Sequence, residues 1–198
     1  MSEPTEQSNL ARSLEGDGEA YARIVASYQT QIARRMRVFA NDPAVVEELV
    51  QEVFVDAYFS LPKFREGNFP GWLKQIATRV GYRYWKKNRR RAESGRDDEW
   101  WRQLAQHKIE VLDRAAVVRL VRALMDRLPP RDRLALVLIY IEGHSIDEAA
   151  RLAGWSKTMV KVQAFRARRK MRAFFAELGI DNVQSACETV GDAIHERL

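Results

Sequence analysis

The chain has 198 residues, 46% of them hydrophobic, with a formal net charge of +6 and a single cysteine, Cys187. Its length and apolar content predict a folded protein of one or two domains, and the sequence divides best into two. No apolar run is long enough to cross a membrane, the start does not resemble a signal peptide, and one cysteine excludes an internal disulfide or a multi-cysteine zinc site. We therefore expect a cytoplasmic protein without membrane insertion.

The two ends of the chain are acidic, and the basic residues lie between them. Residues 1–15 are polar without a sustained period, so we expect them to be disordered. Residues 179–198 form an acidic C-terminal extension. This extension is expected to be a solvated end or, as the alternative, a phosphate mimic that inhibits the basic part of the chain.

Two amphipathic helices are predicted after the N-terminal segment. Apolar residues recur at helical spacing over about residues 19–40, and AsnAspPro at 41–43 supplies an N-cap and a first-turn proline for the next helix. LeuPro at 61–62 ends that helix. One of its faces is apolar, and the other carries Glu47, Glu48, Gln51, Glu52 and Asp56. The acidic face fits either solvent or a protein partner with a basic groove.

The stretch Phe64–Arg91 interleaves aromatic and cationic residues. A turn at Glu66–Gly71 carries one apolar side chain, Phe69, and leads into a helix without acidic residues from 78 to 91. Aromatic rings stack on unpaired bases and cations bind phosphates, which favours contact with single-stranded nucleic acid. The alternatives are a core position for Trp72, which follows helical spacing, and a solvated helix end for the basic run.

Residues 92–109 lack an apolar period and are predicted to be an interdomain linker. Its adjacent Trp100 and Trp101 could dock on a domain or line a channel, and the sequence does not decide between these. Beyond it, helices are expected up to the proline pair at 129–130, from there to Glu142, and from the capping box Ser145–Glu148 to Gly154.

A final helix is predicted to begin after Ser156, with Val160, Ala164, Ala167 and Met171 as its buried stripe. Two helices joined by a tight turn, the second of them basic, are typical of a helix-turn-helix, whose second helix enters the DNA major groove. We expect the face opposite the stripe to meet base edges. This face and its neighbours comprise Lys157, Thr158, Lys161, Val162, Gln163, Arg166 and Arg169.

The sequence contains none of the common phosphate-loop, dinucleotide, zinc-protease or acyl-transfer signatures, and its three histidines are far apart. We therefore expect no catalysis, no metal and no cofactor. A nucleic-acid-modifying enzyme would need a clustered carboxylate or metal site, and the acidic residues of 47–56 are spaced as a helix face instead.

Five segments, taken in order, resemble the extracytoplasmic-function (ECF) sigma factors of bacterial RNA polymerase. They are GluLeuValGlnGluValPhe at 48–54, PheArgGluGlyAsnPheProGlyTrpLeu at 64–73, the basic run, LeuProProArgAspArg at 128–133 and the terminal helix-turn-helix. The resemblance implies an all-α fold of two small helical domains joined by a flexible linker, the second ending in the helix-turn-helix. The implied domains span residues 16–91 and 110–178.

The resemblance also implies a transcription initiation factor that binds core RNA polymerase, recognises two promoter elements and melts promoter DNA. The polymerase would bind through its clamp coiled coil and flap, with the coiled coil against Glu48, Gln51, Glu52 and Asp56. The minus-ten element would meet Arg65, Asn68, Phe69, Arg79, Arg83, Lys86, Lys87 and Arg90. The helix-turn-helix would read the minus-thirty-five element, and an anti-sigma factor is a further implied partner.

The chain departs from the family at the start of its last helix. The family usually has GlyThrValLysSerArg there, whereas this chain has ThrMetValLysValGln at 158–163. Met159 cannot donate the phosphate hydrogen bond that a threonine would make, and Val162 and Gln163 change the groove face. The alternative function is a helix-turn-helix regulator that binds duplex DNA without polymerase and uses its first domain for another protein or a ligand.

Overall fold

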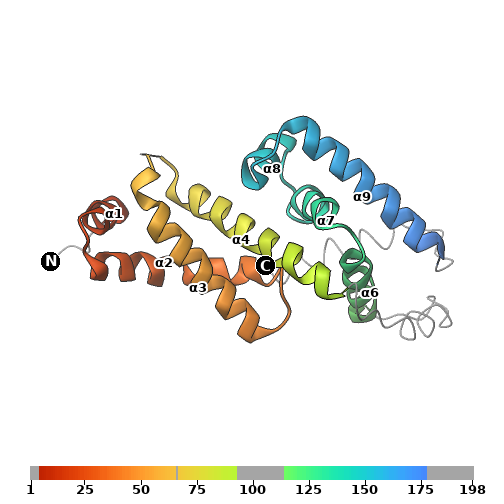
Figure 1. Ribbon diagram of the computed structural model, residues 1–198, viewed down its shortest axis with the longest axis horizontal. Coiled ribbons are helices and arrows are strands. Elements are labelled where there is room, and N and C mark those ends of the chain that lie inside the picture. The colour runs from red at the N-terminus through yellow and green to blue at the C-terminus, as the bar shows by residue number, and fades with distance from the viewer. Residues whose placement is uncertain (1–4, 66, 93–113, 178–198) are drawn as a thin grey trace. The chain divides into compact units, whose positions relative to one another are not determined.

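The computed structural model of the chain describes residues 5–65, 67–92 and 114–177 (Figure 1). Within these ranges every regular element is helical, which confirms the all-α fold. The chain divides into two compact units, Met1–Tyr84 and Trp85–Leu198. This division lies earlier than the expected domain end at residue 91. The linker beyond Ala92, the pair Trp100 and Trp101 and the C-terminal extension fall outside the described residues.

The first unit contains the N-terminal helices. In chain order they are α1 Glu6–Leu14, α2 Gly18–Met36, α3 Pro43–Ser60, a short 3₁₀ turn η1 Leu61–Lys63 and α4 Phe69–Ala92, whose last turns extend past the division. Helix α2 packs against both α1 and α3. The predicted start of α3 is confirmed, since the Asp42 carboxylate accepts a hydrogen bond from the Ala44 amide at 3.0 Å and Pro43 occupies the first turn.

Helix α1 corrects the expectation of disorder for residues 6–14 of the N-terminal segment 1–15. The Thr5 hydroxyl caps its first turn. The buried Asn9 accepts a hydrogen bond from Arg23 Nε on α2 at 3.0 Å, and the Tyr28 hydroxyl of α2 donates to the Glu6 carboxylate. The helix is therefore held by tertiary contacts with α2, which a scan for local hydrophobic period does not detect.

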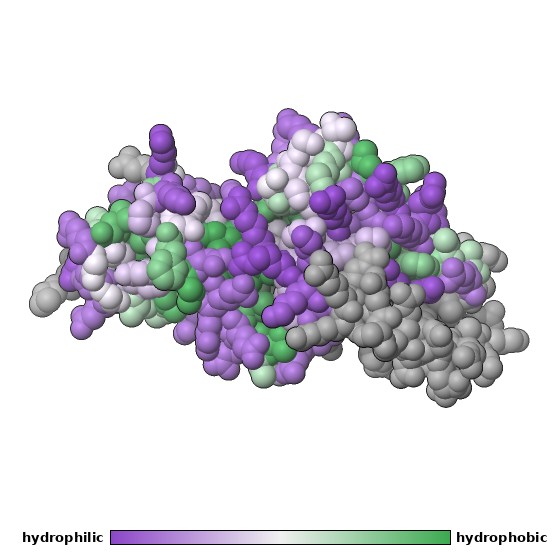
Figure 2. Space-filling view, viewed as in Figure 1, coloured by the Kyte–Doolittle hydropathy of each residue, from purple (hydrophilic) through white to green (hydrophobic). Residues whose placement is uncertain are grey.

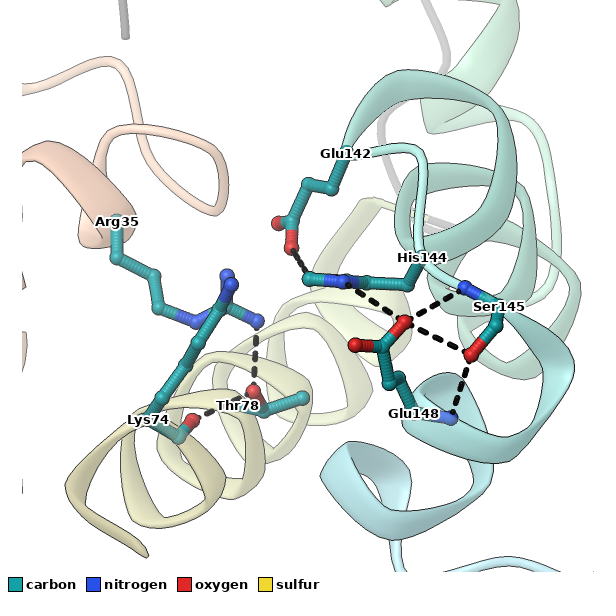
Figure 3. Close-up of polar contacts among 7 residues, drawn as sticks. All are labelled: Arg35, Lys74, Thr78, Glu142, His144, Ser145 and Glu148. Atoms are coloured by element: carbon teal, nitrogen blue, oxygen red, sulfur yellow. Dashed lines mark hydrogen bonds and ion pairs between the residues drawn. The ribbon is translucent and has the colours of Figure 1, made fainter. Parts of the chain in front are cut away.

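A buried arginine fixes α4 against α2. Arg35 is 9% exposed, and its Nη2 donates to the Thr78 hydroxyl at 2.7 Å, which in turn donates to the Lys74 carbonyl at 2.7 Å (Figure 3). Close to this junction Gly81 faces the ring of Phe39. A Cβ atom on Gly81 would lie 2.3 Å from Phe39 Cγ, so only glycine allows this approach of the two segments.

The second unit contains the helix-turn-helix. Its helices are α6 Arg114–Asp126, α7 Pro130–Leu136, a π-helical turn η3 Val137–Ile141, α8 Ile146–Ala153 and α9 Lys157–Glu177. Helices α6, α7 and α8 all pack against α9 (Figure 1). The helix expected from Pro130 to Glu142 is present and changes from α-helical to π-helical after Leu136, where the Glu142 amide bonds to the Val137 carbonyl five residues back, at 2.9 Å.

The turn chemistry predicted for this unit is confirmed. Gly143 and Gly154 have φ of 68° and 69°, in the left-handed region. Ser145 and Glu148 form the capping box of α8, and the hydrogen bonds from Ser145 lower the pKa of Glu148 (Figure 3). His144 precedes this box, with its Nε2 3.0 Å from a Glu142 carboxylate oxygen. The backbone of the turn is therefore set by local interactions.

A partly exposed lysine neutralises a buried carboxylate where α7 meets α9. The Asp132 side chain is 4% exposed, and its Oδ2 lies 2.6 Å from Lys170 Nζ. Replacing Lys170 by methionine leaves this carboxylate unpaired, so we expect the second unit to lose about 1–3 kcal/mol of unfolding free energy, measured by urea denaturation. An Asp132→Asn, Lys170→Met double variant should recover part of that loss. Equal stability of wild type and Lys170→Met would contradict the assignment.

Candidate protein and nucleic-acid interfaces

Helix α3 presents an acidic face to solvent. Its buried side chains, Val46, Leu49, Val53, Phe54 and Ala57, repeat at helical spacing and pack into the first unit. The opposite side carries the residues predicted for a protein partner, and we call these four the acidic face: Glu48, Gln51, Glu52 and Asp56. The first three are exposed and Asp56 is half-buried. The structure therefore places the predicted set on one surface.

Arg83 of α4 reaches across to this acidic face. Its Nη2 lies 2.7 Å from Glu52 Oε1 and 2.7 Å from Asp56 Oδ2. Partial burial acts to lower the pKa of Arg83, but the hydrogen bonds to the two carboxylates outweigh it and raise that pKa. Sequence reasoning put Arg83 with the DNA contacts and the two acids on a protein interface. In the structure the three side chains form one ion-pair cluster, and the DNA contact of the half-exposed Arg83 stays a prediction.

The loop before α4 ends in an aromatic cluster. Phe69 is 1% exposed, and its ring centroid lies 5.5 Å from those of Tyr28, Phe64 and Trp72. The expectation that Phe69 contacts DNA is therefore corrected: its ring is covered by protein and cannot stack on a base. Trp72 is half-buried in the same cluster, in agreement with the alternative that it is a core residue.

Two polar residues of this loop are exposed. Arg65 and Asn68 both face solvent. The Asn68 side-chain carbonyl accepts the Gly71 amide at 2.8 Å and so caps α4, which fixes the side chain close to the helix start. The loop therefore offers one guanidinium and one ordered amide side chain as candidate nucleic-acid contacts.

Helix α4 exposes cations while burying its apolar side. Leu73, Ile76, Ala77 and Val80 are buried, whereas Arg79, Lys86 and Lys87 are exposed. The side chain of Arg90 lies outside the described residues. The exposed side of α4 is thus positively charged, as nucleic-acid phosphates require.

Helix α9 separates a buried stripe from an exposed face. The predicted stripe is confirmed, since Val160, Ala164, Ala167 and Met171 are all buried. Of the residues predicted opposite it, six are exposed, and we call them the reading face: Lys157, Thr158, Lys161, Val162, Arg166 and Arg169. Gln163 is 8% exposed, so its expected base contact is corrected. Lys157 is also engaged, with Nζ 2.8 Å from Asp147 Oδ2 on α8.

Sequence reasoning missed one residue on this side of α9. Phe165 is 58% exposed, although a phenylalanine in an amphipathic helix usually joins the core. The signal was its spacing, because Phe165 follows Val162 by three residues and precedes Arg169 by four. It therefore lies with the reading face and away from the buried stripe.

The described residues contain neither a metal-binding cluster nor a membrane-spanning helix. No group of three or more histidine, cysteine, aspartate or glutamate side chains there is placed to hold a metal ion. No helix in these ranges combines the length and apolarity needed to span a membrane. The candidate sites in the described part of the chain are therefore surfaces of charged, polar and aromatic side chains.

Comparison with known protein families identifies both parts of the chain. Residues 24–91 match Sigma-70 region 2, and residues 119–171 match Sigma-70, region 4. The first match contains α3 with its acidic face, the loop and most of α4. The second covers the helix-turn-helix and most of α9.

Whole-chain comparisons agree with these domain matches. The ECF RNA polymerase sigma factor SigE of Mycolicibacterium smegmatis is 24% identical over 84% of this chain, which spans 66% of that protein, just under two thirds. The ECF RNA polymerase sigma factor EcfG of Rhodopseudomonas palustris is 30% identical over 64% of this chain and 69% of its own length.

Among solved structures, CnrH in complex with the cytosolic domain of CnrY superposes with a TM-score of 0.53 at 25% identity. This alignment covers 85% of the present chain and 95% of CnrH. Two helical units with these matches, in this order, leave one assignment: the chain belongs to the ECF sigma factor family of RNA polymerase.

Proposed function

We propose that this chain initiates transcription by recruiting core RNA polymerase to promoters and opening the DNA there. One observation carries the proposal: the chain exposes an acidic face on α3 and a cationic side on the adjacent α4. A regulator that acts on duplex DNA through its helix-turn-helix and binds another protein with its first domain would use the acidic face but not the cationic side of α4. An initiation factor needs one for polymerase and one for the promoter.

The acidic face is the proposed site for the clamp coiled coil of core polymerase. Glu48, Gln51 and Glu52 are exposed on one side of a single rigid helix, which suits a partner surface of opposite charge. The ion pairs of Arg83 with Glu52 and Asp56 keep the last two turns of this face in place. We assign the flap of polymerase to the second unit on the family resemblance.

The proposed minus-ten contacts lie on α4 and the preceding loop. Arg79, Lys86, Lys87 and Arg90 would bind phosphates, while Arg65 and Asn68 would meet an extruded base. Extruding a base costs a few kcal/mol, which stacking and hydrogen bonds to its exposed edge offset. Because Phe69 is buried beneath the loop, it supports the loop from below and leaves base contact to the two polar residues.

The proposed minus-thirty-five contacts lie on the reading face of α9. A helix of this kind lies in the major groove with its N-terminal residues against base edges. Thr158 and Val162 are the exposed residues nearest its start that have no charge, and Arg166 and Arg169 follow them along the same side. We propose no cofactor for any of these steps.

A regulatory protein is proposed as a further partner. CnrH, which shares the fold of this chain, has been solved in complex with the cytosolic domain of CnrY. By analogy, an anti-sigma factor that covers the acidic face or the reading face would keep this chain from polymerase or promoter.

Run-off transcription with purified core polymerase tests the function. We expect the chain to support initiation from a subset of a promoter library, with permanganate-reactive thymines marking a melted bubble on those promoters. Core polymerase without the chain is the control. Duplex binding by the chain alone, with neither core binding nor a bubble, would replace the proposal by the regulator alternative.

A further inference from the structure

Two large apolar side chains lie exposed on the reading side of α9. Val162 is 41% and Phe165 is 58% exposed. They are three residues apart and are therefore neighbours on the helix surface. At 3.6 residues per turn, Thr158 and Arg169 share their side, while Val160 lies in the buried stripe on the opposite side. We call Val162 and Phe165 the apolar pair, and it occupies the middle of the exposed face.

The surroundings of the apolar pair indicate what covers it. Lys161, Arg166 and Arg169 are exposed around it, so the surface over α9 is largely hydrophilic with small hydrophobic areas (Figure 2). An apolar centre within a ring of cations matches an anionic partner that offers a small apolar group. The major groove of DNA is such a partner, because it is lined by phosphates and the thymine C5-methyl is its apolar group.

We propose that the apolar pair reads thymine C5-methyl groups in the upstream promoter element. The inference rests on the proposed function, which places α9 in the major groove. Val162 and Phe165 would each cover a methyl that otherwise faces water. A cytosine at the same position lacks the methyl and carries an amino donor on the adjacent ring carbon, which an apolar side chain cannot pair, so it would bind more weakly. Part of the promoter specificity would then come from apolar contacts.

The test compares thymine with uracil, which differs from it by the methyl alone. Duplexes bound by the full chain with core polymerase are first selected from a library randomised upstream of the melted region. Each thymidine of the enriched upstream segment is then replaced by deoxyuridine, one at a time. We expect one or two positions at which affinity falls about fourfold, the effect of burying one methyl-sized group.

Variants of the chain connect this loss to the two residues. Val162→Ser and Phe165→Ala should each bind the thymine duplex more weakly, and each should no longer distinguish uracil from thymine at one of the sensitive positions. Leu14→Ser is the matched control, since Leu14 is 52% exposed at the end of α1, outside the acidic face and the reading face. It should keep the full ratio between thymine and uracil duplexes, and thermal melts confirm that all three variants fold.

The outcomes separate this inference from the proposed function. Selection of specific duplexes whose affinity is indifferent to uracil, or whose uracil effect persists in both variants, would overturn the inference and leave the sigma-factor function standing. Loss of binding to core polymerase without DNA in Val162→Ser and Phe165→Ala would make the pair a protein contact and also overturn it. Failure to enrich any duplex would overturn the proposed function, and the inference with it.

Discussion

Replacing Gly81 by leucine is expected to unfold the first unit of the chain. The position has no room for a side chain, because a Cβ atom there would lie 2.3–2.4 Å from three atoms of the Phe39 ring. Phe39 is itself 3% exposed and is enclosed by the core, so its ring cannot swing aside. Alanine, the smallest change, should already cost about 1–3 kcal/mol of unfolding free energy through overpacking.

This cost runs against the usual effect of glycine in a helix. Gly81 lies inside α4, where replacing glycine by alanine normally gains about 1 kcal/mol in helix propensity. Gly18→Ala in the first turn of α2 is the control, since a Cβ there meets no atom within 4 Å. It should leave stability unchanged or slightly raised, as followed by circular dichroism during urea unfolding.

A second substitution identifies the contact. In a Phe39→Ala background the ring is gone, and Gly81→Ala should become neutral or stabilising. In the chain that keeps Phe39, Gly81→Ala should lower the protection of backbone amides against hydrogen exchange in peptides from α2, α3 and α4. A destabilisation by Gly81→Ala that is the same with and without the Phe39 ring would refute the steric account.

Replacing Glu52 by lysine is expected to lower the affinity for core RNA polymerase at least about 100-fold. The change reverses a charge at the centre of the acidic face and also removes one carboxylate partner of Arg83, which lies 2.7 Å away. A cation placed against a basic partner surface costs several kcal/mol, which corresponds to a factor of this size. Fluorescence anisotropy of the labelled chain titrated with core polymerase measures it.

The control for this variant carries the same change of charge elsewhere. The Glu19 side chain on α2 is 90% exposed, and Glu19→Lys should bind core polymerase as the wild type does. Both variants should retain the melting temperature to within a few degrees, because exposed ion pairs contribute little to stability. Wild-type affinity in Glu52→Lys would remove the acidic face from the polymerase interface.

Local interactions explain what could be predicted from the sequence. The cap at Asp42, the capping box of Ser145 with Glu148 and the left-handed Gly143 all depend on neighbours within a few residues, and the structure confirms them. The buried stripe of α9 likewise follows from period alone. Such features need no knowledge of the rest of the fold.

The errors concern contacts between distant residues. Helix α1 is held by Asn9 and Glu6 through partners on α2, and Phe69 is buried because rings from α2 and from both sides of the loop converge on it. The pairing of Arg83 with the acidic face likewise depends on α3 and α4 being side by side. The sequence shows which charged and aromatic residues could form a binding surface. Only the packing of the fold decides which of them are exposed.

The two sides of α9 can change independently of each other during evolution. The buried stripe of α9 and its exposed reading face have no residue in common, so a substitution at Thr158, Val162 or Arg166 leaves the interior of the second unit intact. On the proposed function, new base preferences would therefore arise at little cost in stability, and a duplicated copy of the gene would have a short route to a different set of promoters. Gln163, buried beside the stripe, is the predicted contact position where this freedom ends.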